Sequence, residues 1–268
     1  MTALKIALTG ATGGIGSAMA QGFAQAGHSV VLLGRNSEAL AALRDSLNQP
    51  ERHQIVLADL SSAATITSLA AELATMGNID VLINNAGVSD FGLVTDLPDD
   101  AIAHMLQVNL IAPILLCRAL LPLLRASTNA CIINIGSSFG SIGYAGFSAY
   151  CASKFGLRGF TEALQRELAD QPIAVHYLAP RAVRTTMNSP AVVAMNKELG
   201  NSEDEVEIVA AAALQLLSQR RSCNRYLGWP EKFFVRLNAL LPNVVANALK
   251  KQLPVIQRYA KQHRGASL

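Results

Sequence analysis

The chain is poor in charged and aromatic side chains. Of its 268 residues, 15% are Asp, Glu, Lys or Arg and 5% are Phe, Trp or Tyr, with a single tryptophan. Hydrophobic residues make up 51%, so the chain can bury a large core or cover an apolar interface. No apolar run reaches the roughly 20 residues that a membrane-spanning helix needs. There is also no internal repeat or low-complexity segment, so the sequence predicts a globular fold without a membrane span.

Cysteines are few, and their spacing does not fit a metal cluster. The four thiols stand at positions 117, 131, 151 and 223. Reduced thiols are typical of a cytoplasmic protein, and the N-terminus runs directly into a predicted strand without a signal peptide. We therefore expect a cytoplasmic protein without a metal site, in which Cys151 is a small buried residue and not a nucleophile.

Apolar, strand-like runs alternate with helical patterns along most of the chain. This order is typical of a doubly wound parallel sheet with helices on both faces. The length alone allows one or two domains. We predict a single α/β domain over residues 1–228, followed by a helical extension over residues 229–268.

A glycine-rich turn follows the first predicted strand, residues 4–8, and precedes a helical pattern over residues 17–26. The turn reads Thr9-Gly10-Ala11-Thr12-Gly13-Gly14-Ile15-Gly16. In a Rossmann-type fold, Gly10 permits the tight turn, Gly14 lets backbone N–H groups approach a pyrophosphate, and Gly16 lets the helix pack close to the strand. Such a loop also occurs as an ordinary strand–helix turn. In this context it predicts a dinucleotide site that includes Thr12, Gly13 and Ile15.

The next two strands indicate which dinucleotide binds. The second, residues 28–33, ends at Gly34-Arg35-Asn36, without the acidic residue that usually binds a free ribose 2′-hydroxyl. Arg35 can pair with a 2′-phosphate, which favours NADP(H), although an arginine at an exposed strand end can equally be solvated. Asp59 and Leu60 follow the third strand, residues 54–58. Asp59 can accept a hydrogen bond from adenine or cap a helix that starts near residues 61 and 62.

Tyr150 and Lys154 stand four residues apart, and Ser137 precedes them at the end of another predicted strand, residues 131–135. If a helix begins near Ala149, both side chains project from one face of it. A nearby ammonium favours phenolate, so Lys154 is expected to lower the pKa of Tyr150 from its ordinary value of about 10. Tyr150 would then exchange a proton near neutral pH, as a general acid or base.

In order and spacing, these motifs resemble those of the short-chain dehydrogenase/reductase family, over residues 4–228. The family's catalytic tetrad matches Asn109, Ser137, Tyr150 and Lys154. Its second motif matches at Asn85, Ala86 and Gly87, and the segment after its sixth strand matches at Pro180, Val183 and Thr185; the resemblance implies that these six residues lie beside the cofactor. Arg181 replaces a glycine of the family. We expect Arg181 either to point outward or to reach an anionic group of the cofactor or substrate.

The resemblance also implies an activity, that of an NADP(H)-dependent oxidoreductase which interconverts a carbonyl and a primary or secondary alcohol. Tyr150 would donate a proton to the carbonyl oxygen, and Ser137 would hydrogen-bond that oxygen. Lys154 would hold the nicotinamide ribose, and Asn109 would help to hold a water molecule. Family members are commonly dimers or tetramers, so we expect a homodimer or homotetramer. The alternative is a regulatory or scaffold protein that binds NADP(H) without catalysis.

Two segments concern the substrate. Four residues between Ser137 and Tyr150 are expected to line its pocket or to join the core: Phe139, Ile142, Tyr144 and Phe147. Residues 186–205 are expected to be irregular and polar at their end. The resemblance implies that they form a lid over the substrate, and the alternative is a loop that leads to a helix with an acidic first turn.

The extension, residues 229–268, is basic and amphipathic. It carries seven Lys and Arg residues against one Glu, and its apolar residues recur at helical spacing. Such helices can lie on anionic membrane surfaces, but an apolar stripe more often packs on its own subunit or a partner, which is the interpretation we favour. The tail loosely resembles those of family members that act on steroids, retinoids or other lipids, which implies a small lipophilic substrate: a ketone, an aldehyde, or a steroid-like or 3-oxoacyl compound. The basic charge lies only in the tail, without an aromatic platform, so no nucleic-acid partner is expected.

Overall fold

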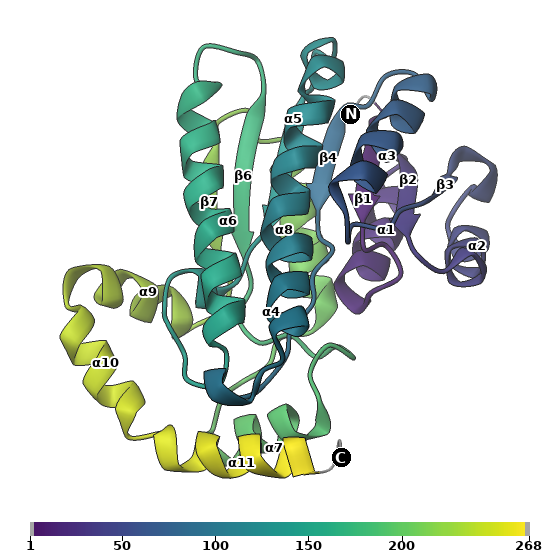
Figure 1. Cartoon of the computed structure of the whole chain (residues 1–268). Coiled ribbons are helices and arrows are strands. Elements are labelled where there is room, and N and C mark those ends of the chain that lie inside the picture. The colour runs from purple at the N-terminus through teal and green to yellow at the C-terminus, as the bar shows by residue number, and fades with distance from the viewer. Residues whose placement is uncertain (1–2, 266–268) are drawn as a thin grey trace.

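The computed structural model describes residues 3–265, and its centre is a seven-stranded parallel sheet (Figure 1). The strands are β1 (Lys5–Thr9), β2 (Ser29–Gly34), β3 (Gln54–Leu57), β4 (Val81–Asn84), β5 (Cys131–Ile135), β6 (Ala174–Ala179) and β7 (Cys223–Tyr226). Their order is β3-β2-β1-β4-β5-β6-β7, with every neighbouring pair parallel. The chain changes direction across the sheet between β1 and β4, and a doubly wound sheet opens a ligand crevice at this point, beyond the carboxyl ends of its strands.

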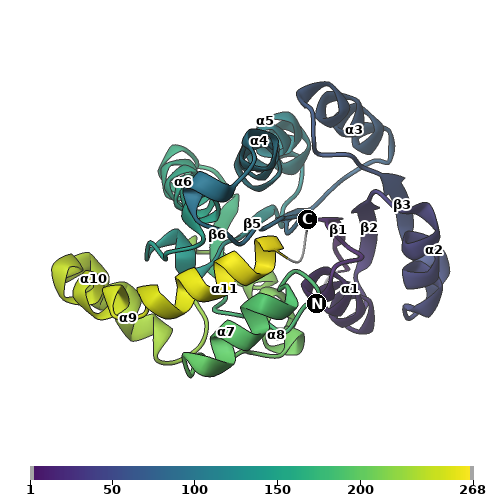
Figure 2. The same cartoon turned by 60° about the horizontal axis from the view of Figure 1, so that its bottom comes forward.

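Helices cover both faces of the sheet (Figure 2). One layer consists of α1 (Gly14–Gln25), α2 (Ser37–Ser46) and α8 (Val206–Leu217). The other consists of α3 (Ala63–Thr75), α4 (Asp99–Leu106), α5 (Ala112–Arg125) and α6 (Ser148–Glu167). Short 3-10 turns lie at Pro50–Arg52, Val94–Asp96 and Ser138–Gly140. The predicted doubly wound α/β fold is therefore confirmed.

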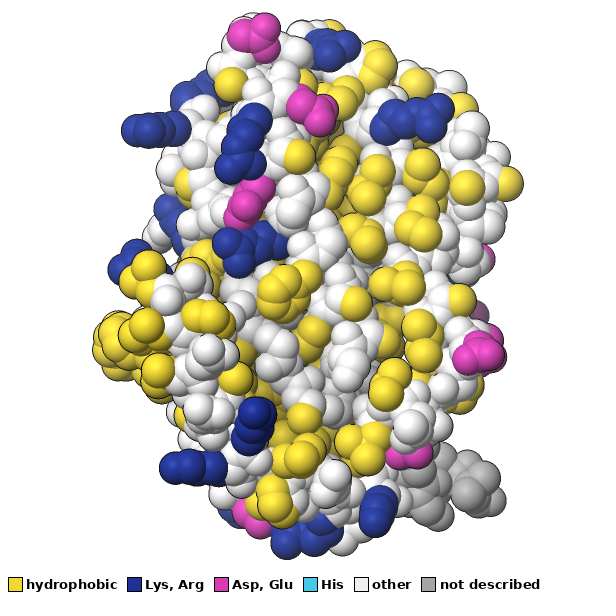
Figure 3. All heavy atoms as spheres, turned by 60° about the vertical axis from the view of Figure 1, so that its left-hand side comes forward, with side chains coloured by type: hydrophobic (Ala, Val, Ile, Leu, Met, Phe, Trp, Pro, Cys, Tyr) yellow, Lys and Arg dark blue, Asp and Glu magenta, His cyan; other side chains and the backbone are white. Residues whose placement is uncertain are grey.

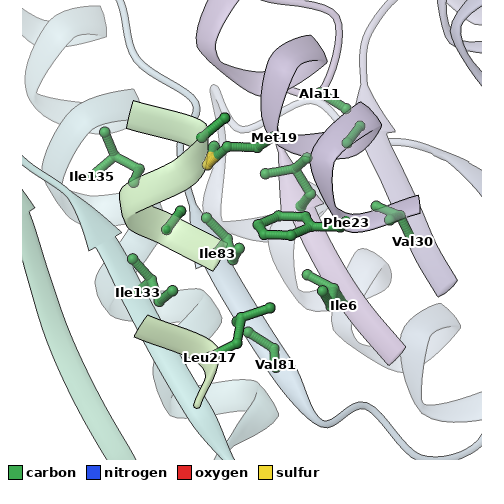
Figure 4. Packing of buried hydrophobic residues seen from close by; sticks show 14 of the residues in the cluster. Ile6, Ala11, Met19, Phe23, Val30, Val81, Ile83, Ile133, Ile135 and Leu217 are labelled. Atoms are coloured by element: carbon green, nitrogen blue, oxygen red, sulfur yellow. The ribbon is translucent and has the colours of Figure 1, made fainter. Parts of the chain in front are cut away.

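The strands are almost entirely apolar because both of their faces are buried. Successive side chains of a strand point to opposite faces, so Ile6 packs with α1 and α8 whereas Ala7 belongs to the layer of α3 and α5. Figure 4 shows the first of these layers: Phe23 of α1 lies beside Ile6, and Leu217 of α8 lies close to Val81. This packing fixes α1, and with it the glycine loop, against the sheet.

The chain from Asp99 to Arg125 forms one continuous helical run. It joins α4 and α5 through a π-helical turn, Gln107–Ile111. By length and composition it could cross a membrane, with a mean hydropathy of 1.7, which corrects the expectation that no such stretch exists. Part of the run is buried against α3 and α6, and Asn109 in its middle faces the crevice region. In this fold it therefore serves as a core helix.

The segment 186–205 is more regular than the sequence predicts, because it contains α7 (Pro190–Glu198). The Ser189 hydroxyl caps this helix by accepting a hydrogen bond from the Val192 N–H group at 3.4 Å. Glu205 then precedes the first turn of α8. The structure therefore combines a helix over the crevice with the expected acidic start of the following helix.

The extension forms three further helices (Figure 1): α9 (Glu231–Leu240), α10 (Pro242–Lys250) and α11 (Leu253–Gly265). Val235 of α9 and Val245 of α10 are buried beside Ile142. Ile256 of α11 is buried in a cluster that includes Val192 of α7. The extension therefore packs on the α/β domain of its own chain, with α9 and α10 forming an arm at its side.

Candidate functional site

The glycine loop between β1 and α1 forms a cradle at the carboxyl edge of the sheet. Gly10 has a φ of +63°, and a Cβ atom there would lie 2.8 Å from the Ala86 Cα. A Cβ atom on Gly16 would lie 2.1 Å from the Gly10 carbonyl oxygen. The first turn of α1 has N–H groups without intrahelical partners, and a helix N-terminus attracts negative charge. The cradle therefore fits a pyrophosphate, because backbone approaches where side chains are excluded.

Polar side chains tie the loop after β4 to this cradle. The Thr9 hydroxyl accepts hydrogen bonds from the N–H groups of Asn85 (2.9 Å) and Ala86 (3.0 Å). The Asn85 amide donates to the carbonyl oxygens of Thr9 (3.0 Å) and Gly10 (3.1 Å). The structure thus brings Asn85, Ala86 and Gly87 to the same pocket as Gly10, Thr12, Gly13, Gly14, Ile15 and Gly16.

Arg35, Asp59 and Leu60 line the pocket at the ends of β2 and β3. Arg35 is exposed there. Asp59 does not cap α3, because Ser62 holds that position and accepts a hydrogen bond from the Thr65 N–H group at 3.2 Å. The Asp59 carboxylate instead accepts hydrogen bonds from the Ser61 N–H and hydroxyl groups, both at 2.9 Å, and these bonds lower the pKa of Asp59. The capping alternative for Asp59 is therefore wrong.

Ser137, Tyr150 and Lys154 converge at the centre of the pocket. α6 begins at Ser148, so Tyr150 and Lys154 share one face of its first turns. The Lys154 Nζ lies 5.7 Å from the centroid of the Tyr150 ring and donates to the Ile135 carbonyl oxygen at 3.0 Å. Ser137 follows β5, and its hydroxyl lies near enough to Tyr150 to oppose the rise in the pKa of that tyrosine. A proton donor, a second hydrogen-bonding hydroxyl and an ammonium group therefore face one space.

Burial governs the pKa values of Tyr150 and Lys154. It raises the pKa of Tyr150 to about 12, and the nearby Ser137 hydroxyl opposes this shift. It lowers the pKa of Lys154 to about 8. The expectation that Lys154 lowers the pKa of Tyr150 is wrong for this arrangement, because removal from water destabilises the charged form of each group. Tyr150 is accordingly held in its protonated form, ready to donate.

Asn109 lies in the π-helical turn and is fully buried. Its Oδ1 atom accepts a hydrogen bond from the Val88 N–H group at 2.8 Å. Its Nδ2 atom donates to the Val88 carbonyl oxygen at 2.8 Å and to the Ser153 hydroxyl at 3.1 Å. Both amide atoms are engaged by the protein. The side chain therefore ties α6 to the loop after β4.

The segment after β6 brings Pro180, Val183 and Thr185 to the pocket. Arg181 behaves in neither of the two expected ways. Its guanidinium donates to Asp204 Oδ1 from Nε at 2.9 Å and from Nη2 at 2.6 Å. It also donates from Nη1 to the Trp229 carbonyl oxygen at 2.9 Å and to Glu231 at 3.3 Å. Arg181 therefore joins the extension to the core, and its charge is neutralised by the chain itself.

Beyond Tyr150, the pocket becomes apolar and extends to the tail. Its volume is about 760 Å³. The rings of Phe139 and Tyr144 stack with centroids 4.9 Å apart, and the Tyr144 hydroxyl donates to Gln252 at 2.6 Å. The apolar lining comes from several segments, namely Phe139, Ile142, Tyr144, Phe147, Val192, Phe234, Leu237, Val244, Val245, Ala248 and Leu249. This end of the pocket is suited to an apolar molecule.

A family model described as short chain dehydrogenase matches residues 5–196. The chain belongs to this family. Dehydrogenase/reductase SDR family member 7B from Mus musculus is 36% identical over 201 residues, which cover 73% of this chain and 62% of that protein. The chain therefore spans under two thirds of that relative's length. Short-chain dehydrogenases are oxidoreductases that bind NAD(P)(H).

Two solved structures share the fold. A short-chain dehydrogenase from Streptomyces avermitilis has a TM-score of 0.79 at 29% identity, over 95% of this chain and 97% of that chain. A metagenomic short-chain oxidoreductase in complex with NADP has a TM-score of 0.69 at 31% identity, over 84% of this chain and 95% of that chain. The similarity to the first includes most of the extension as well as the sheet.

The sequence analysis missed Tyr177, which lies in β6 directly behind Ser137. Its hydroxyl donates to the Ser137 carbonyl oxygen at 3.2 Å and accepts from the Ser137 N–H group at 3.3 Å. A Cβ atom on Gly136 would lie 2.1 Å from the Tyr177 ring. The sequence signals for this contact were the tyrosine within the apolar strand β6 and the glycine just before Ser137, after β5. The sequence analysis also missed that the Thr9 side chain joins β1 to β4, the two strands between which the chain changes direction across the sheet.

Proposed function

We propose that this short-chain dehydrogenase is an NADP(H)-dependent enzyme that interconverts a carbonyl and an alcohol on a lipophilic substrate. The observation that carries the proposal is the convergence of Ser137, Tyr150 and Lys154 on one pocket that joins the glycine cradle to an apolar chamber. An acidic or phosphorylated substrate would find little to pair with there, because Arg181 is already neutralised by Asp204 and Glu231.

The residues of the site divide the work of carbonyl reduction. A nicotinamide cofactor held by the glycine cradle would supply hydride for the carbonyl carbon. Tyr150 donates its phenolic proton to the oxygen, which is consistent with burial holding it protonated. Ser137 hydrogen-bonds the same oxygen and places it within reach of Tyr150. Lys154 lies beside the tyrosine, with its Nζ atom 5.7 Å from the centroid of the ring, where it would hold the nicotinamide ribose. In alcohol oxidation the proton transfer runs in reverse.

Arg35 supports a preference for NADP(H) over NAD(H). It lines the pocket at the end of β2, where an enzyme specific for NAD(H) would present an acidic side chain to the ribose. A guanidinium pairs well with a 2′-phosphate. The solved relative that contains NADP agrees with this preference.

NADPH consumption at 340 nm tests the proposal, with a panel of lipophilic ketones, aldehydes and 3-oxoacyl esters. The wild-type chain and Tyr150→Phe are compared, with NADH in place of NADPH as the cofactor control. We expect turnover with NADPH and a loss of at least about 100-fold in the variant, the scale of general acid catalysis. Equal turnover in the variant refutes the role of Tyr150. Tight NADPH binding without turnover on any substrate favours the non-catalytic alternative.

We also propose that the chain forms a homodimer through α5 and α6. Ile111, just before α5, and Phe155 of α6 are large apolar residues that remain exposed on this side of the molecule. Contact with a second copy would remove these apolar side chains from water, which favours association. Light scattering on the purified chain should give twice the monomer mass, and Phe155→Glu should give the monomer. A monomeric wild-type chain would contradict the proposal.

A further inference from the structure

The arm formed by α9 and α10 has two different sides. One side lines the apolar chamber through Phe234, Leu237 and Val245. The other side faces away from the domain, and Figure 2 shows both helices standing out from the body of the molecule. Trp229 just before α9 is 71% exposed, and Leu240 at its end is 79% exposed. Trp229 is the only tryptophan of the chain. Large apolar side chains that are this exposed indicate a surface that contacts a partner.

The exposed apolar residues follow the helical repeat. Phe233 and Leu240 are seven positions apart on α9, so they lie on one face of the helix, and both are exposed. Leu241 and Val244 continue the apolar surface into α10 and are also exposed. We call these four residues together with Trp229 the arm surface, namely Trp229, Phe233, Leu240, Leu241 and Val244.

Basic side chains surround the arm surface. Lys232 and Arg236 project from α9, and Lys250 and Lys251 stand at the end of α10; all four are exposed. Among the described residues none of the four forms an ion pair. The one acidic residue of residues 229–263, Glu231, is paired with Arg181. Figure 3 brings this side of the molecule forward and shows hydrophobic side chains with Lys and Arg among them.

We propose that the arm surface docks on an anionic lipid bilayer. Apolar side chains flanked by unpaired lysines and arginines match the acyl boundary and the negative headgroups of such a surface. A second copy of this chain is the less suitable occupant, because a symmetric contact would bring like-charged lysines and arginines together. The charge of the arm therefore favours a bilayer over self-association.

The geometry links this docking to the chamber. Phe234 and Val244 line the pocket and are also exposed, so they form part of its mouth. With the arm surface on a bilayer, this mouth would face the lipid phase. A lipophilic substrate could then enter without crossing water, a consequence that rests on the proposed function, whereas the docking itself does not.

Trp229 provides the direct test, because its fluorescence is the only tryptophan emission of the chain. The full chain is mixed with vesicles of phosphatidylcholine alone or with 30 mol% phosphatidylserine, a composition on the order of anionic cellular leaflets. We expect a blue shift of the emission, quenching by brominated acyl chains, and co-sedimentation with the anionic vesicles. Added salt should weaken the binding, because it screens the lysines and arginines.

Two variants separate the apolar and the charged contributions. Phe233→Ser/Leu240→Ser should abolish the insertion of Trp229, and Lys250→Glu/Lys251→Glu should weaken binding to anionic vesicles by at least about 30-fold, from roughly 5-fold for each cation lost. Val94→Ser/Ile208→Ser is the matched control, because both residues are exposed apolar side chains outside the arm. The control should bind like the wild-type chain. Circular dichroism and turnover of a short, water-soluble ketone show that each variant is folded.

Three outcomes would overturn the proposal. The first is the absence of any spectral shift or co-sedimentation with anionic vesicles. The second is equal binding to neutral and anionic vesicles, which would remove the role of the basic residues. The third is a blue shift that appears without lipid as protein concentration rises, together with a larger mass by light scattering that Leu240→Ser abolishes; this would identify a second copy of the chain as the partner.

Discussion

Replacing Arg181 by Met should destabilise the protein strongly, although the residue lies outside the catalytic set. The Asp204 side chain is only 7% exposed, and its Oδ1 atom accepts two hydrogen bonds from the Arg181 guanidinium. Its Oδ2 atom has no hydrogen-bond partner among the described residues. The substitution would therefore leave a buried carboxylate without a counter-charge. Removal of one partner of such a pair costs about 3–5 kcal/mol.

Urea unfolding followed by circular dichroism measures this cost, and the neighbouring Arg184 offers a matched control. Arg184 forms an ion pair with Glu205 at 2.8 Å, but the two side chains are 69% and 55% exposed. Exposed pairs contribute about 0–1 kcal/mol, so Arg184→Met should be nearly neutral. Asp204→Asn, added to Arg181→Met, should recover at least half of the loss, because the stranded charge is removed. Similar losses for Arg181→Met and Arg184→Met would refute the argument from burial.

Three further predictions concern the cofactor, the position of Ser137 and acid stability. Arg35→Ala should lower kcat/KM with NADPH by about 10- to 100-fold and leave kcat/KM with NADH unchanged, since charged hydrogen bonds contribute about 1.5–3 kcal/mol. Arg44 is an exposed arginine outside the pocket, so Arg44→Ala should change neither value. A loss of kcat/KM with NADH in Arg35→Ala would contradict the phosphate contact. Tyr177→Phe should lower kcat more than it raises KM, because only the hydroxyl that holds the Ser137 backbone is lost, and an unchanged kcat would exclude this role. Burial lowers the pKa of His176 from 6.5 to about 4. Folded His176 therefore resists protonation, and the free energy of unfolding should fall by up to about 3 kcal/mol as pH decreases from 6.5 to 4. Urea midpoints across this pH range should fall less for His176→Asn than for the wild-type chain. An equal fall of the urea midpoint with pH in both proteins would exclude His176 as the cause.

Local patterns were sufficient to predict the sheet and the glycine loop. The glycine loop needs only a strand before it and a helix after it, and both come from hydrophobic periodicity within residues 4–26. Tyr150 and Lys154 needed only the spacing of one helical turn. The structure places the side chains of Tyr150 and Lys154 beside Ser137, which follows the end of β5.

What the sequence could not provide were contacts between distant segments and the effect of burial on charge. Arg181 was interpreted as a solvent- or ligand-facing residue because its partners, Asp204 and Glu231, lie 23 and 50 positions further along the chain. The pKa of Tyr150 was expected to fall because Lys154 was visible in the sequence, whereas the loss of solvent around both groups was not. The segment of α7 was expected to be irregular because its short apolar pattern gains a partner only when α11 covers it.

Under the proposed function, substrate recognition and proton transfer lie in different parts of the chain. Ser137, Tyr150 and Lys154 come from the central domain, whereas much of the outer chamber wall comes from residues 231–252, after the last strand. Changes in that terminal stretch can alter which molecules fit without disturbing the sheet, the cradle or the proton donor. Diversification of substrate range by exchange of a C-terminal module is therefore open to this architecture, both in evolution and in chimaeras between relatives.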